Sequence, residues 1–99
     1  ILDNSGWCDD SKSNQYNKLI NFPFCYSAEK LYRSDNLYDI VCEINYNQNP
    51  TIKNKGSAIF MHLANKKFQP TEGCIALNKA NLIKLLTQIN VGTSIFIRY

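Results

Sequence analysis

A histidine and a cysteine are the residues of this chain with the clearest capacity for chemistry. His62 is the only histidine among the 99 residues, and Cys74 directly follows Gly73. A thiol becomes an effective nucleophile when a base accepts its proton, and imidazole is the side chain best suited to this near neutral pH. Gly73 leaves the approach to the sulfur open and permits backbone conformations that larger residues resist. The pair therefore predicts acyl transfer through a thioester on Cys74.

The remaining cysteines do not turn this pair into a metal site. The chain has four cysteines but no C-x-x-C pair, and one histidine cannot complete a zinc-ligand pattern. We therefore expect no metal and no cofactor. Oxidation would allow three full pairings, and a Cys8–Cys25 disulfide is an open alternative. Cys42 lies in an alternating segment and is expected to be a small buried hydrophobic residue.

The composition is that of one small globular domain covering residues 1–99. Hydrophobic residues make up 44% and charged residues 19% of the chain. The net charge of +3 is mild and the lysines are scattered, so nucleic-acid binding is not expected. No apolar run approaches the ~20 residues needed to span a bilayer. Because the chain starts at Ile1 without an initiator Met, we expect a piece of a longer protein, and a preceding signal peptide is compatible with this.

The elements expected to position the pair are mostly strands. Residues 38–46 alternate and are rich in β-branched and aromatic side chains, which predicts a strand. Residues 57–64 form a nearly continuous apolar run, typical of a buried central strand, with His62 near its end. Residues 74–77 and 93–97 predict two further short strands.

Helical signals are few. Asn78 is a suitable N-cap for an amphipathic helix reaching about Gln88 or Ile89, with Leu and Ile on its inner face. Residues 27–30 have the form of a capping box and predict a short helix. Residues 1–28 are otherwise expected to be a long ordered loop anchored by aromatic residues, with one helical turn near 17–20. The fold class is therefore mostly β (α+β), with one C-terminal amphipathic helix.

Several segments in order resemble the catalytic core of the L,D-transpeptidase (YkuD-type) family. The core segments are Gly56-Ser-Ala-Ile-Phe-Met-His62, Pro70-Thr-Glu-Gly-Cys-Ile-Ala-Leu77, the Asn-capped helix and Gly92-Thr-x-Ile. An upstream set is similar to a bacterial branch of the family: Gly6-Trp-Cys-Asp-Asp10, Tyr16-Asn17, Ala28-Glu29, Arg33-x-Asp35 and Tyr38-Asp39. The resemblance implies a β-sandwich core. The family fold has more strands upstream, so the resemblance also implies that residues 1–99 are the C-terminal part of the catalytic domain.

The resemblance implies a mechanism on peptidoglycan stem peptides. Cys74 would attack the carbonyl between the L-centre of a diamino acid and the following D-residue, with His62 as the base. The carbonyl of Leu63 would orient the imidazole. The backbone N–H groups of Gly73 and Cys74 are candidates for the oxyanion hole.

The candidate substrate-binding residues are Arg33, Glu72, Tyr38 and Trp7. Most family members carry a second histidine where this chain has Glu72, and Arg or Asn where it has Ala76. Arg33 could supply the missing cation, because a guanidinium suits bidentate carboxylate binding. The alternative is that Arg33 pairs with neighbouring carboxylates.

Two of these residues also have structural alternatives. Trp7 either lines the cleft or anchors an ordered loop. Glu72 is either a solvated loop residue or tunes the pKa of the adjacent thiol.

Three activities remain open from the sequence. The first is an L,D-transpeptidase, a monomer in the periplasm or cell envelope. The second is an L,D-carboxypeptidase, in which water rather than an amine resolves the thioester. The third is a non-catalytic wall-binding module in which all four cysteines are paired.

Overall fold

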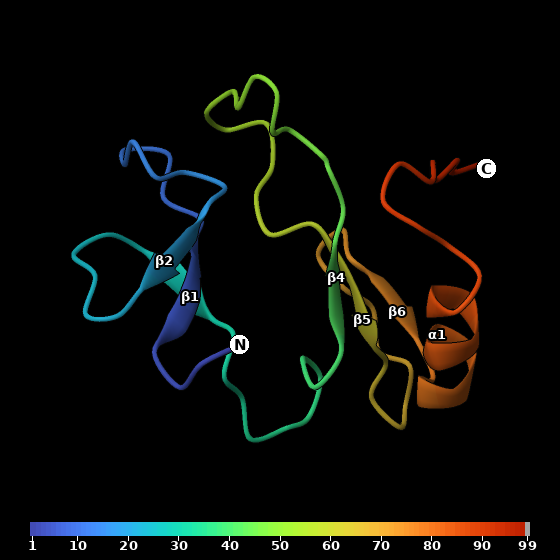
Figure 1. The fold of residues 1–99 in the computed structure, drawn as a ribbon. Coiled ribbons are helices and arrows are strands. Elements are labelled where there is room, and N and C mark those ends of the chain that lie inside the picture. Colours follow the sequence, from blue (N-terminus) through green and yellow to red (C-terminus); the bar gives the residue numbers. More distant parts are fainter. Residues whose placement is uncertain (99) are drawn as a thin grey trace.

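A computed structural model describes residues 1–98 and contains two small β-sheets and one helix. The first sheet has the order β2-β1-β3 and is antiparallel throughout. The second sheet has the order β4-β5-β6, and α1 lies beyond β6 (Figure 1). The elements are β1 (Ser5–Cys8), β2 (Leu19–Asn21), β3 (Ala28–Lys30), β4 (Val41–Glu43), β5 (Phe60–Leu63), β6 (Ile75–Leu77) and α1 (Lys79–Leu86). The mostly β, α+β fold class is confirmed.

Strand β5 is the centre of the second sheet. It pairs antiparallel with β4, where Val41 lies opposite His62, and parallel with β6, where His62 lies opposite Ala76. All four of its residues are buried. A strand paired on both sides and covered on both faces is a rigid place from which to present a side chain.

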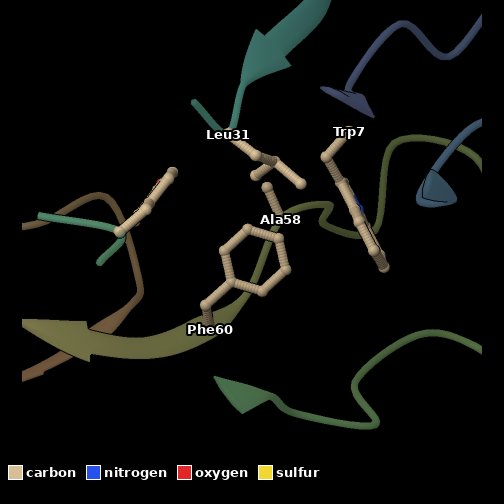
Figure 2. Close-up of a cluster of buried hydrophobic side chains, with 5 residues drawn as sticks. Trp7, Leu31, Ala58 and Phe60 are labelled. Atoms are coloured by element: carbon tan, nitrogen blue, oxygen red, sulfur yellow. The ribbon is translucent and has the colours of Figure 1, made fainter. Parts of the chain in front are cut away.

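The two faces of β5 pack against different layers. Met61 and Leu63 point to Leu82 of α1, which is fully buried. Phe60 and the preceding Ala58 point the other way, toward Trp7 and Leu31 in the cluster that joins the two sheets (Figure 2). Because side chains alternate along a strand, His62 shares the face of Phe60.

The first 30 residues differ from the expected loop. They form the whole first sheet, and residues 28–30 are strand β3 rather than a helix. The capping box lacks a glutamate at Lys30, and pairing of Glu29 with Trp7 on the central strand outweighs the weak helical signal. The helical turn near 17–20 is also wrong, because Asn17 has a φ of 58° and Leu19 already begins β2.

The later elements are shorter than the patterns predicted. Within the strand expected over 38–46, only the residues of β4 are strand, and within the one expected over 57–64, only those of β5. Ala58 has a φ of 59°, which interrupts the extended backbone before β5. Helix α1 ends at Leu86 with Thr87 as C-cap, and residues 93–97 form no strand. The Asn78 cap is confirmed, since its side chain accepts the Asn81 N–H at 2.8 Å.

The eight residues of α1 make the only helix in residues 1–98. No helix in these residues is both long and apolar enough to cross a membrane.

Candidate active site

Cys74 lies immediately before β6, with its side chain half-buried against the cluster that joins the two sheets. Its thiol donates to the Ala58 carbonyl oxygen at 3.2 Å, and its sulfur accepts the Phe60 N–H at 3.4 Å. Burial raises the pKa of the Cys74 thiol; the Phe60 N–H acts against this and the charge of Glu29 adds to it. A thiol in this setting stays protonated near neutral pH and needs a base to become a nucleophile.

His62 is 6% exposed, and one of its ring nitrogens is fixed by the backbone. Nδ1 lies 2.7 Å from the carbonyl oxygen of Leu63. A carbonyl oxygen can only accept, so Nδ1 carries the proton and Nε2 remains free to accept one. The contact that the resemblance predicted for Leu63 is therefore present.

Packing brings His62 and Cys74 to the same cluster: Cys74 packs against the buried residues that include Phe60 and Tyr38, and the His62 ring contacts that of Tyr38. His62 lies opposite Ala76 in the parallel pairing of β5 with β6, and Cys74 precedes Ala76 by two residues. Within residues 1–98 the hydrogen bonds of the thiol go to the backbone of Ala58 and Phe60 rather than to the imidazole.

The loop before Cys74 is shaped by two residues. The Thr71 hydroxyl donates to the Cys74 carbonyl oxygen, which closes the turn. Gly73 has a φ of +113°, a conformation that residues with a Cβ rarely adopt. Neither Gly73 nor Cys74 donates its N–H to a turn or loop hydrogen bond within the described chain. Glu72 is exposed on this loop.

Arg33 is held by two carboxylates. Its Nε donates to Asp35 Oδ1 at 2.9 Å and its Nη2 pairs with the other oxygen of Asp35, while Nη1 lies 3.9 Å from Glu29. Its guanidinium carbon lies 5.2 Å from the centre of the Tyr38 ring. Pairing with Asp35 raises the pKa of Arg33 and holds that of Asp35 at about 2. Arg33 therefore pairs with neighbouring carboxylates, which was the alternative to a substrate role: Asp35 takes Nε and Nη2, and Glu29 lies near Nη1.

Trp7 lies in the core between the sheets. Its ring packs edge-on against Phe60, with centroids 5.1 Å apart, and its indole N–H donates to Asn17 Oδ1 at 2.9 Å. One edge of the residue borders a cavity of about 630 Å³ between the two sheets, which Leu31 and Phe60 also line. Neither Cys74 nor His62 lines that cavity. These contacts are those of an anchor.

Asn17 is a supporting residue whose role sequence reasoning missed. Its side chain makes four hydrogen bonds: Oδ1 accepts from Trp7 Nε1 and the Ala58 N–H, and Nδ2 donates to the carbonyls of Tyr46 and Asn47. It is 3% exposed and has a positive φ, which asparagine tolerates better than most residues. Its place beside Tyr16 in the resembling motif was the available signal.

The cysteines are all free, including Cys8 and Cys25, so the disulfide considered from the sequence is not formed. Cys42 is half-buried rather than buried. In the described part of the chain, no group of three or more His, Cys, Asp or Glu side chains is placed to hold a metal ion.

Comparison with known proteins identifies the class. Residues 3–97 match the family model described as YkuD, the L,D-transpeptidase catalytic domain. The chain therefore belongs to this family. No curated protein and no solved structure matches it.

Proposed function

We propose that this protein is a cysteine-dependent L,D-transpeptidase that acts on peptidoglycan stem peptides in the periplasm or cell envelope. Family membership supports the reaction class. The observation that carries the assignment to residues is the placement of His62 and Cys74 against the same Tyr38 and Phe60 cluster, with Nδ1 of His62 bound to the Leu63 carbonyl oxygen. A fixed tautomer with a free Nε2 suits an imidazole that takes the proton of a nucleophilic thiol.

The first half-reaction forms the thioester. Nε2 of His62 takes the thiol proton as Sγ of Cys74 bonds to the carbonyl carbon of the stem peptide. The resulting oxyanion is stabilised by the N–H groups of Gly73 and Cys74, each worth roughly 2.7–4 kcal/mol at comparable sites. As the C–N bond breaks, the imidazolium returns its proton to the amine of the departing D-residue.

The second half-reaction resolves the thioester. An amine of another stem attacks the thioester carbonyl and passes a proton to His62, which returns it to the departing sulfur of Cys74. Because burial raises the pKa of this thiol, the sulfur is protonated before the reaction begins. Proton transfer is therefore coupled to attack and to expulsion, and both steps depend on His62.

Substrate recognition is the finer part of the proposal. Arg33 would offer its Nη1 N–H groups to a stem carboxylate, beside the Tyr38 ring that it covers. Glu72, exposed next to the nucleophile, would face the acceptor amine. Trp7 would contribute through the edge that borders the cavity between the sheets.

The test incubates the protein with muropeptide tetrapeptides and follows the products by mass spectrometry. We expect loss of the terminal D-residue together with cross-linked dimers. Cys74→Ala should abolish both, while Cys25→Ala, which removes an exposed free thiol, should leave them unchanged. Loss of the D-residue without dimers would identify an L,D-carboxypeptidase.

The assignment also predicts that a carbapenem acylates Cys74, since a strained β-lactam carbonyl is an electrophile for such a thiol. Identical muropeptide products from wild type and Cys74→Ala would contradict the catalytic assignment. The free state of all four cysteines argues against a disulfide-stapled wall-binding module.

A further inference from the structure

Tyr38 is the point at which the proposed base meets the rest of the fold. Its ring lies edge-on to the imidazole of His62, with centroids 5.3 Å apart and an interplanar angle of 72°. It lies equally edge-on to Phe60, at 5.8 Å and 88°. The backbone N–H of Phe60 holds the sulfur of Cys74, so one ring contacts both strand residues that define the site. Tyr38 is only 7% exposed, which leaves the ring little freedom to move.

The other end of Tyr38 is attached to the first sheet. Its hydroxyl donates to Oε1 of Glu29 on β3, and the guanidinium of Arg33 covers the ring. Burial raises the pKa of Tyr38 and the bond to Glu29 raises it further, so the phenol remains a neutral donor at neutral and moderately alkaline pH. The titratable and charged groups that face this ring are Glu29 on β3, Arg33 after β3, His62 on β5 and Cys74 before β6.

The backbone alone does not fix the imidazole. The bond from Nδ1 to Leu63 anchors one corner of the ring, but the ring can still rock about that corner. The T-shaped contact with the Tyr38 ring restricts this rocking, because edge-to-face pairs have a preferred geometry. The restraint works only if Tyr38 is itself held, and the hydroxyl bond to Glu29 holds it.

We propose that Tyr38 is a positioning residue for the reaction: its ring fixes the imidazole of His62 beside Cys74, and Glu29 fixes Tyr38 from the opposite sheet. The inference rests on the proposed roles of His62 and Cys74. It gives Tyr38 a task other than contact with substrate. It also makes the first sheet part of the alignment of the base, although that sheet carries neither the base nor the nucleophile.

The experiment measures alkylation of Cys74 by iodoacetamide across a pH series, with the modified peptide quantified by mass spectrometry. Iodoacetamide needs no stem peptide, so the result is independent of substrate recognition. In wild type, His62 should make Cys74 reactive at lower pH than in His62→Ala. Tyr38→Leu removes the ring and should shift the profile toward that of His62→Ala, with carbapenem acylation roughly 100-fold slower. Tyr38→Phe keeps the ring but loses the bond to Glu29, and acylation should slow by about fivefold.

A double-mutant cycle separates positioning from general stability. If the hydroxyl acts through Glu29, then Tyr38→Phe combined with Glu29→Leu should be no slower than the slower single variant. Tyr26→Phe, which removes a hydroxyl from an exposed tyrosine, and Glu43→Gln are the matched controls and should behave as wild type. If Tyr38→Leu proves unfolded, the Tyr38→Phe and Glu29→Leu cycle decides the question alone.

Wild-type alkylation profiles in folded Tyr38→Leu, or strictly additive effects in the cycle, would overturn the positioning role. An unchanged profile in His62→Ala would overturn it as well, because there would be no base to position. Failure of the proposed function would give a different result: neither the wild type nor any variant would release the D-residue from muropeptides, whatever the alkylation profiles are.

Discussion

The two sheets of this protein differ in how they use polar groups. The second sheet and the loop beside it carry the thiol and the imidazole, and the groups around them leave reactive atoms free: Nε2 of His62 and a sulfur with weak backbone contacts. The first sheet and its loops do the opposite. Both polar atoms of the buried Asn17 side chain make two hydrogen bonds each, and the indole N–H of Trp7 donates one of them.

The two regions are joined at few points. Asn17 accepts the N–H of Ala58, whose carbonyl receives the thiol, and Glu29 accepts the hydroxyl of Tyr38. Polar groups whose hydrogen bonds are all made form a rigid support, whereas polar groups with a free donor or acceptor are available for reaction. The first sheet therefore supports the proposed site, although it carries neither the base nor the nucleophile. Variants in the two regions should therefore fail in different ways.

The largest expected effect comes from His62→Ala. It removes the base while leaving the thiol, so carbapenem acylation of Cys74 should slow by about 10²–10⁴-fold. The raised pKa of the thiol implies that the residual rate increases with pH, through a midpoint above that of an ordinary cysteine. Stopped-flow acylation across a pH series measures both effects.

Added imidazole is the control for this variant. It should restore part of the rate in His62→Ala, because the space left by the side chain can admit the missing base. It should have no effect on the wild type. An acylation rate unaffected by the mutation would remove His62 as the base and place the chemistry elsewhere.

Asn17→Ala is the corresponding test in the first sheet. It leaves four polar groups without their partner in a buried setting, and an alanine at a φ of 58° adds backbone strain. The free energy of unfolding should fall by about 3 kcal/mol or more. Urea denaturation followed by tryptophan fluorescence measures it.

Two companion variants separate the contributions of the side chain and of backbone strain to that loss of stability. Asn17→Gly removes the side chain without the strain, and should recover about 1 kcal/mol. Asn21→Ala, at an exposed position of β2, should be close to wild type. If Asn17→Ala were as stable as Asn21→Ala, the first sheet would not depend on this network, and the contrast between the two regions would fail.

Gly73→Ala lies between the two extremes, because it strains the backbone inside the site. At a φ of +113° a Cβ is disfavoured, and it would come within 3.2 Å of Ile59 Cδ1. The expected cost is about 1–2 kcal/mol of stability. Acylation should slow by about tenfold as the N–H groups beside the sulfur are displaced.

Gly92→Ala is a matched control for this variant. Gly92 also has a positive φ, of +98°, but nothing lies within 4 Å of an added Cβ. It should show a similar loss of stability and a wild-type acylation rate. Equal acylation rates in the two variants would mean that Gly73 serves the loop alone.

The sequence predicted the family and the mostly β fold class, but not the individual strands of the first sheet. His62, Gly73 and Cys74 could be singled out because each is a residue type with few alternative uses in that order. The first sheet could not be found, because its strands are only three or four residues long and lie in a segment whose loops are rich in Asn, Asp and Ser. Such strands are specified by pairing with a distant partner rather than by local propensity. Asn17 was missed for the same reason: its four partners lie up to 41 positions away along the chain.

The smallest expected effect concerns Asp35, in the segment that connects the two sheets. Arg33 holds the pKa of Asp35 at about 2, below its usual 3.8, so the ionised carboxyl is favoured in the folded state. The stability it contributes is therefore present above about pH 4 and is lost as the pH falls toward 2. Because the pair is largely exposed, Asp35→Asn should cost less than about 1 kcal/mol at pH 6, and high salt should reduce that cost. Urea midpoints of wild type and Asp35→Asn should converge as the pH falls below about 3, whereas Asp3→Asn should match wild type throughout. A constant gap between the Asp35→Asn and wild-type midpoints at every pH would show that this carboxyl acts through its hydrogen bond to Leu37 rather than through its charge on Arg33.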